Sequence, residues 1–293
     1  MPPSCSEYPR VSVVISTYNR PQQLDTALAS VHAQTFGDFE VVIVDDCSPH
    51  PADSPLTAKL QQQTFPPAYI EVLEKWNVEF EKRGIDIIAA RLGENSGYHC
   101  MPKNKGIEQA RGDYIAYLDD DNEWRPDHLQ VCVDAIESGF STDMVYTRMC
   151  YRGNKAEIDK LNESTMIVDG VKGGKIPLGD APGQEWNPIL LNQFNYIDTS
   201  VIMHSKGAYW RLVRDSGYGW DETLRRFGDW NFVWRWGVFG LTGKLVDKVT
   251  LDYNWHANQL QLTRPCVEIP VCLNYSQYIA MRKDRNRELA AAS

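Results

Sequence analysis

The stretch VSVVISTYNRPQQLDTALASVHAQTFGDFEVVIVDD, residues 11–46, decides the fold class. It opens with the β-branched run VSVVI at 11–15, which predicts a strand buried on both faces of a parallel sheet. A polar turn follows, and Pro21 is typical of the first turn of a helix. A second apolar run at 39–44 ends in two aspartates. Strand, helix and strand in this order predict a βαβ unit.

The same alternation continues along the chain. Further strands are expected at 85–92, 114–118, 143–151, 201–203 and 244–251, with helices at 69–80, 103–111, 126–138 and 224–238. This pattern predicts an α/β fold with a mostly parallel central sheet flanked by helices. Such a sheet binds its ligand at the carboxyl ends of the strands.

Composition excludes several classes of protein. The chain has 293 residues, 43% of them hydrophobic and 24% charged, which is typical of a globular protein with a substantial core. The net charge of −9 disfavours binding to nucleic acid or to anionic membranes. No apolar stretch has the length of a membrane span, and the first residues lack the apolar core of a signal peptide. Seven scattered cysteines predict reduced thiols and a cytoplasmic location.

Three adjacent carboxylates, Asp119, Asp120 and Asp121, directly follow the predicted strand 114–118. Neighbouring carboxylates repel one another unless a cation or a donor compensates them. Mg²⁺ and Mn²⁺ favour carboxylate oxygens together with substrate phosphates, so the triplet indicates a metal site. The alternative is a solvated acidic turn before the next helix. The spacing of an EF-hand, with Gly at its sixth position and Glu at its twelfth, is not present.

Other strand ends also carry polar residues. The first predicted strand ends in Ser16, Thr17 and Tyr18, with Arg20 close behind, and the second ends at Asp46. A tyrosine ring can stack on a base, an arginine can face a phosphate, and a carboxylate can accept an N–H from a pyrimidine. The same residue types also form turns and helix caps. No GxGxxG follows the first strand, which disfavours a dinucleotide site.

Three later residues are further candidates. Asp229 opens an aromatic helix, where an acid is either a catalytic group or a helix cap. His256 follows the last predicted strand and is either a metal ligand or a structural residue. Lys103 follows the turn ENSG and either reaches a diphosphate or is a solvated lysine.

Together these motifs resemble family 2 inverting glycosyltransferases with a GT-A fold. The resemblance runs from the opening stretch through ENSG, KNKGIEQARGDYIAYLDDDNEWRPDHL and WDETLRRFGDWNFVWR, and covers residues 10–260 approximately. The segments NYIDTSVIMH and FGDWNFVWR are most similar to the spore-coat polysaccharide type. The resemblance implies a nucleotide-sugar donor, Mn²⁺ or Mg²⁺ as cofactor, and a carbohydrate or other hydroxyl-bearing acceptor.

The resemblance also implies a role for each matching residue. Tyr18 would pack on the base, with Ser16, Thr17 and Arg20 beside it, and Asp46 would read a pyrimidine, which favours UDP or dTDP. Within the DxD motif, Asp120 would face the ribose and Asp121 would hold the metal, joined by His256. Asp229 would be the general base. The remaining residues that the resemblance assigns to the donor site are Asn95, Lys103 and Asp119.

The chain departs from the family pattern at two places. The family's Ala-Arg-Asn is Pro102-Lys103-Asn104 here, with slightly longer spacing, and its Glu-Asp before the catalytic helix is Gly228-Asp229. Asp229 is therefore the sole acid at that point. A sugar nucleotidyltransferase, a haloacid-dehalogenase-type phosphohydrolase and a non-catalytic binding protein are the alternatives. The first needs a Gly-rich, Arg-containing loop after the first strand, and the second needs its nucleophile motif there; STYNRPQQ is neither.

We expect four regions along the chain. A lead at 1–10 precedes a nucleotide-sugar-binding half at 11–151 and a smaller acceptor-binding and catalytic half at 152–260. Within the latter, 152–188 is expected to be a long loop or hairpin that shapes the acceptor site. A helical, basic tail at 261–293 is expected to be solvated, with contact to a membrane surface as the alternative.

Overall fold

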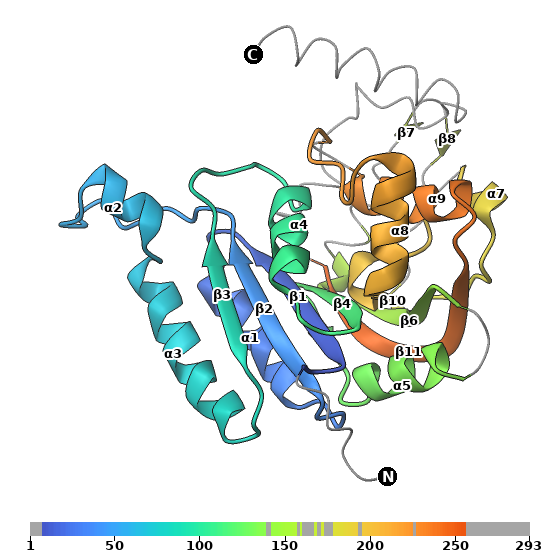
Figure 1. Ribbon diagram of the computed structural model, residues 1–293, viewed down its shortest axis with the longest axis horizontal. Coiled ribbons are helices and arrows are strands. Elements are labelled where there is room, and N and C mark those ends of the chain that lie inside the picture. Colours follow the sequence, from blue (N-terminus) through green and yellow to red (C-terminus); the bar gives the residue numbers. More distant parts are fainter. Residues whose placement is uncertain are drawn as a thin grey trace, which may run out of the picture.

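A computed structural model describes residues 8–138, 142–156, 159, 167–168, 171–172, 178–192, 195–224 and 227–255. Its centre is a nine-stranded sheet with the order β3-β2-β1-β4-β10-β6-β11-β5, and β9 pairs with β6 (Figure 1). The strands are β1 Val11–Thr17, β2 Phe39–Asp45, β3 Ile87–Arg91, β4 Tyr114–Asp119, β5 Glu123–Trp124, β6 Met144–Arg152, β9 Gly179–Asp180, β10 Ile202–Ser205 and β11 Gly243–Asn254. A separate hairpin joins β7 Ile167–Val168 to β8 Val171–Lys172.

The strands β1, β2, β3 and β4 are parallel, and β6 is parallel to β11. The strand β10 lies antiparallel between β4 and β6 and joins these two groups. Six of the nine strands therefore run in one direction, which confirms the expected mostly parallel sheet. Strands from both sides of residue 151 belong to it.

Helices cover the sheet. They are α1 Pro21–His32, α2 Ala58–Gln63, α3 Pro67–Glu81, α4 Cys100–Gln109, α5 His128–Ile136, α7 Pro188–Leu191, α8 Lys206–Ser216 and α9 Gly228–Val238. All residues of β1 and β2 are buried. Since neighbouring side chains of a strand point to opposite faces, both faces of the sheet must be covered at these strands. One cover is α4, where Gly106 lies so close to Val14 that an added Cβ would be 2.4 Å from Val14 Cγ1.

Three expectations need correction. The helix α4 begins at Cys100 rather than at 103, because Pro102 is accommodated in its first turn. The helix α9 begins at Gly228 rather than at 224, because Phe227 has a left-handed backbone with φ of 54°. The helix α8 was not expected at all, and it buries Ala208, Tyr209 and Leu212.

Within 152–188, the structure shows the β7–β8 hairpin, β9 and the start of α7, so a hairpin is present in the expected long loop. The basic tail from 261 and parts of that loop lie outside the described residues. Cys47, Cys100, Cys132 and Cys150 are free thiols. In the described part of the chain, no helix has the length and apolar character needed to span a bilayer.

Candidate active site at the strand ends

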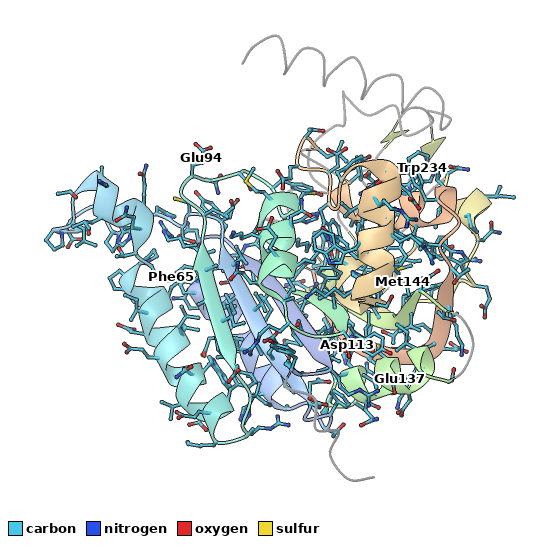
Figure 2. All side chains as sticks on the ribbon, in the orientation of Figure 1. Phe65, Glu94, Asp113, Glu137, Met144 and Trp234 are labelled. Carbon is cyan, nitrogen blue, oxygen red and sulfur yellow. The ribbon has the colours of Figure 1, made fainter. Side chains whose placement is uncertain are left out.

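The predicted donor residues meet at the carboxyl ends of three neighbouring strands. In the register of the sheet, Ser16 of β1 lies opposite Asp119 of β4, and Thr17 lies opposite Asp45 of β2. The backbone N–H of Asp46 donates to the Thr17 carbonyl (2.9 Å). Two labelled residues in Figure 2 mark the opposite ends of the parallel strands. Glu94 follows β3 and marks the carboxyl ends, and Asp113 precedes β4 and marks the amino ends. The site lies at the carboxyl ends, which Glu94 marks, as expected for an α/β sheet.

A single arginine connects two acids of the triplet. The Arg20 guanidinium lies 3.1 Å from Asp120 Oδ1 and 2.8 Å from Asp121 Oδ2. Thr17 Oγ1 donates to the other Asp120 oxygen at 2.7 Å. Tyr69, on α3, receives a hydrogen bond from the Arg20 backbone N–H (2.8 Å), and its hydroxyl also lies 3.1 Å from Thr17 Oγ1. The loop after β1 is therefore fastened to the end of β4.

One arginine does not balance the negative charge of the triplet. Burial and the neighbouring Asp121 raise the pKa of Asp120 to about 7, against the opposing effects of Arg20 and Thr17. Burial opposes the charged form of a carboxylate, and the adjacent Asp121 adds repulsion between like charges. The position therefore favours an additional cation.

Lys103 compensates the first acid of the triplet. Its side chain is completely buried, and Nζ lies 2.8 Å from Asp119 Oδ1 and 5.2 Å from the centroid of the Trp220 ring. Burial opposes the charge of Asp119, but Lys103, with smaller help from His99 and Arg20, lowers the pKa of that carboxyl. Lys103 is therefore a counter-ion inside the protein, and this placement offers no exposed amino group for the predicted contact with a diphosphate.

The predicted base-reading acid is held by the loop after β3. Asp46 is buried, and its two oxygens accept from the Ser96 backbone N–H (2.8 Å) and from Asn95 Nδ2 (3.0 Å). Burial raises the pKa of Asp46, although hydrogen bonds from Ser96 and Gly97 oppose this effect. Nearby, the Tyr18 side chain is 44% exposed, as a ring that stacks on a ligand must be. Asn95 thus belongs to this site through Asp46.

Asp229 lies in the first turn of α9, where the helix dipole favours an anion. Its Oδ2 accepts from Asn195 Nδ2 at 2.8 Å. Burial raises the pKa of Asp229, while the Trp230 backbone N–H and Lys103 lower it and Asp119 raises it further. Gly228, next to Asp229, packs against the start of α4, and α4 carries the Lys103 that pairs with Asp119, so this carboxylate lies near the acids at the end of β4.

The departure at Gly228 has a steric reason. An added Cβ there would be 2.4 Å from Cys100 Sγ and 3.0 Å from His99 Nε2, so a glutamate does not fit. The Gly228 N–H also donates to the Tyr98 hydroxyl at 3.3 Å. The start of α9 is thus pressed against the start of α4.

Backbone strain gathers at the same residues. Among the described residues, the non-glycine residues with positive φ are Asn19 (54°), Cys47 (60°) and Phe227 (54°). Each is next to or one residue removed from a predicted site residue. Such conformations are costly and cluster at functional sites, so they support the assignment of this edge as the site.

The residues present fit a divalent cation in one particular way. Within the part of the chain that the structure describes, no three His, Cys, Asp or Glu side chains form a ready-made metal cage. A site for Mg²⁺ or Mn²⁺ needs only one or two carboxylates, because substrate phosphates and water complete it. Asp120 and Asp121, which share the Arg20 guanidinium, supply such carboxylates. The second predicted ligand, His256, lies outside the described residues.

Sequence reasoning did not single out four residues of this site. Tyr69 joins the loop after β1, Asn195 holds Asp229, Ser200 accepts from the Asp119 backbone N–H (3.2 Å), and Asp198 caps the adjoining turn. Burial and the nearby Asp119 raise the pKa of Asp198 to about 7. The cluster of polar residues in NYIDTS between predicted elements was the available signal.

The sequence is similar to a known protein family and to curated members of it. Residues 12–183, more than half of the chain, match the family described as Glycosyl transferase family 2. WcaA of Escherichia coli (strain K12), a putative colanic acid biosynthesis glycosyl transferase, is 33% identical over 42% of this chain and 36% of its own length. TuaG of Bacillus subtilis (strain 168), a putative teichuronic acid biosynthesis glycosyltransferase, is 34% identical over 42% of this chain and 40% of its own. The match spans less than half of each relative.

Among solved structures, S. aureus TarS 1-349 in complex with UDP-GlcNAc is similar over 88% of this chain and 62% of that chain, with a TM-score of 0.59. The identity is 18%, so this likeness shows the fold, and it confirms the expected GT-A arrangement. The extent of the family match, on a fold with the expected strand-end site, decides the classification: the chain belongs to glycosyl transferase family 2.

Proposed function

We propose that the protein transfers a sugar from a nucleotide-diphosphate sugar to an acceptor hydroxyl, with inversion of the anomeric configuration and with Asp229 as general base. The observation that carries this proposal is the convergence of two acidic groups. Asp120 and Asp121 meet at the end of β4 around Arg20. Asp229 is connected to the same strand end, because it accepts from Asn195, and Ser200, five residues later, accepts from the Asp119 backbone N–H. A donor site and a base are thus neighbours.

The donor nucleotide binds at the ends of β1, β2 and β4. The exposed Tyr18 ring stacks on the base, and buried Asp46, oriented by Asn95 and Ser96, accepts the ring N–H of a pyrimidine. This chemistry favours UDP or dTDP. Solved complexes of TarS with UDP and with UDP-GlcNAc support the choice of UDP as the first ligand to test.

The diphosphate lies at the acidic triplet. Asp121 would hold Mg²⁺ or Mn²⁺, and Asp120, oriented by Thr17, faces the ribose. The cation supplies charge neutralisation to the leaving diphosphate. Arg20, which is paired with Asp120 and Asp121, brings a protein cation to the same strand end.

Asp229 takes the proton of the acceptor hydroxyl as the hydroxyl oxygen attacks the anomeric carbon. Its place at a helix N-terminus stabilises the carboxylate, while burial raises its pKa and makes it a stronger base. A single displacement on the face opposite the leaving diphosphate inverts the configuration.

The test is release of nucleoside diphosphate from UDP-GlcNAc and other UDP-sugars and dTDP-sugars. Each donor is incubated with a panel of sugar acceptors, with Mn²⁺ or with a chelator, and the product anomer is assigned by NMR coupling constants. We expect release that depends on both acceptor and metal, with an inverted product. Pyrophosphate release from a nucleoside triphosphate would instead show a nucleotidyltransferase. Tight nucleotide binding without turnover for any acceptor would show a binding protein.

A further inference from the structure

The amide of Asn195 is fixed at both of its ends. Its Nδ2 donates to Asp229 Oδ2 at 2.8 Å, and its Oδ1 accepts from the Ile197 backbone N–H at 3.1 Å. A backbone N–H requires an oxygen opposite it, and a carboxylate requires a donor. The orientation of the amide therefore follows from its partners, and the NH₂ group faces the base.

The segment that carries Asn195 is anchored to the strand that carries the acidic triplet. Ser200 Oγ accepts from the Asp119 backbone N–H (3.2 Å), and the Ser200 carbonyl accepts from Trp124 Nε1 (2.7 Å). Between these points, Asp198 accepts from the Ser200 backbone N–H at 2.8 Å. Residues 195–200, which we term the connecting segment, thus extend from the end of β4 to the start of α9.

A carboxylate in the first turn of a helix still has freedom to rotate about its side-chain torsions. A general base must present one oxygen within hydrogen-bond reach of the proton that it takes, so loss of orientation reduces the rate without weakening donor binding. Asn195 removes this freedom by holding Oδ2. A hydrogen bond donated to a carboxylate also favours its charged form, whereas burial of Asp229 favours the neutral form.

We propose that Asn195 is a positioning residue that holds the Asp229 carboxylate in its reactive orientation. Through the connecting segment, it also fixes the position of this carboxylate relative to the acids at the end of β4. The inference rests on the proposed role of Asp229 as general base. Asn195 itself makes its contact with the base and not with the reacting atoms.

The test compares Asn195→Ala and Asn195→Asp with the parent protein, using the UDP-sugar and acceptor that support turnover. We expect kcat to fall about 10- to 100-fold, the loss typical of one hydrogen bond to a charged group. The KM for the donor stays unchanged. The acidic limb of the kcat–pH profile moves to higher pH, because Asp229 loses a donor that favours its ionised form. Asn195→Asp keeps the side-chain shape but places a second carboxylate beside Asp229, so its acidic limb is expected to move further than that of Asn195→Ala.

The matched control is Asn192→Ala, in the same region. The Asn192 side-chain oxygen accepts from Trp234 Nε1, about one and a half turns after Asp229 on α9, so this variant is expected to keep the parent kcat and pH profile. In an Asp229→Asn background, Asn195→Ala is expected to cause no further loss, because the group that it positions has been removed.

Failure of this inference differs from failure of the proposed function. If Asp229→Asn abolishes turnover while both Asn195 variants keep the parent kcat and acidic limb, the positioning role is wrong and the base stands. If Asp229→Asn keeps full turnover, the base assignment itself is wrong. Equal losses from Asn195→Ala and Asn192→Ala, with no change in the pH profile, would show a structural role only.

Discussion

The two sides of the site are built in different ways. The donor side forms where parallel strands β1, β2 and β4 end in register, and its acids follow directly after buried apolar runs. The base side forms where α9 starts, and it depends on contacts between distant parts of the chain. Asn195 and Asp229 are 34 residues apart, and Tyr98 and Gly228 are 130 apart. Local pattern thus specifies the first side, and tertiary packing specifies the second.

The charges of the two sides differ as well. On the donor side, Arg20 and Lys103 are paired with the acidic triplet, yet the pKa of Asp120 remains raised to about 7. On the base side, Asp229 is stabilised by an amide and a helix N-terminus. The donor side is therefore suited to receive a cation together with a diphosphate, and the base side is suited to receive a proton.

The largest effect is expected on turnover, from a substitution that changes the base side alone. Asp229→Asn should lower turnover by about 10²–10⁴-fold, the usual contribution of a general base, because the amide cannot accept the proton. Donor affinity, measured by calorimetry, should stay at the parent value. Glu222→Gln is the control, since that exposed carboxylate accepts a hydrogen bond from Asn104, on α4. Parent-level turnover in Asp229→Asn would contradict the assignment.

The second effect is expected from removal of Lys103, the buried counter-ion of Asp119 on the donor side. Lys103→Met leaves Asp119 without its cation, and breaking such a pair costs about 3–5 kcal/mol when both groups are buried. The Asp119 side chain is 27% exposed, so we expect a free-energy loss at the lower end of that range in denaturant unfolding. The double variant Lys103→Met with Asp119→Asn should recover part of the loss, because no unpaired charge remains. An equal loss in both variants would show that packing, not charge, is responsible.

The third effect concerns the base of the nucleotide. Tyr18→Ala should weaken UDP binding by about 1–3 kcal/mol, the usual value of one base–aromatic stacking contact. Tyr18→Phe keeps the ring and should bind UDP like the parent. Trp210→Ala removes another exposed aromatic residue, on α8, and should leave UDP affinity unchanged. A Tyr18→Ala variant with parent affinity would remove Tyr18 from the donor site.

The smallest effect is expected on the pH dependence of stability, from a substitution of Asp198 in the connecting segment. Burial and Asp119 raise the pKa of Asp198 to about 7 in the folded protein, above the ordinary value of 3.8. Between these values the folded state holds more protons than the unfolded state, so this group reduces stability as the pH rises from about 4 to 7. Asp198→Asn should therefore raise the melting temperature above pH 7, and the gain should shrink toward pH 4. A gain that does not change with pH would contradict this origin.

Much of the donor side could be predicted from the sequence, because strand ends and polar turns are adjacent in the chain. Thr17, Arg20 and the acidic triplet meet at the predicted edge of the sheet. The burial of Lys103 could not be predicted in the same way. Its partner Asp119 is nearby in sequence, but the covering Trp220 comes from a distant loop.

Less of the base side could be predicted from the sequence. A carboxylate at a helix start is often only a cap, so Asp229 was identified through resemblance rather than through periodicity. Its partner Asn195 precedes a short turn that no periodic pattern marks. The start of α9 also depends on Phe227, whose left-handed backbone is unfavourable for an aromatic residue.

The central claim is tested most directly by a calorimetric titration of the protein with UDP, dTDP and GDP, with and without Mn²⁺, beside Asp121→Ala. We expect UDP or dTDP to bind in a Mn²⁺-dependent manner. Asp121→Ala should lose at least about 10–100-fold of that affinity, since even removal of an outer-shell partner of a metal has this effect. Unchanged Mn²⁺-dependent affinity in Asp121→Ala, or no binding of any nucleotide by the parent, would contradict the account.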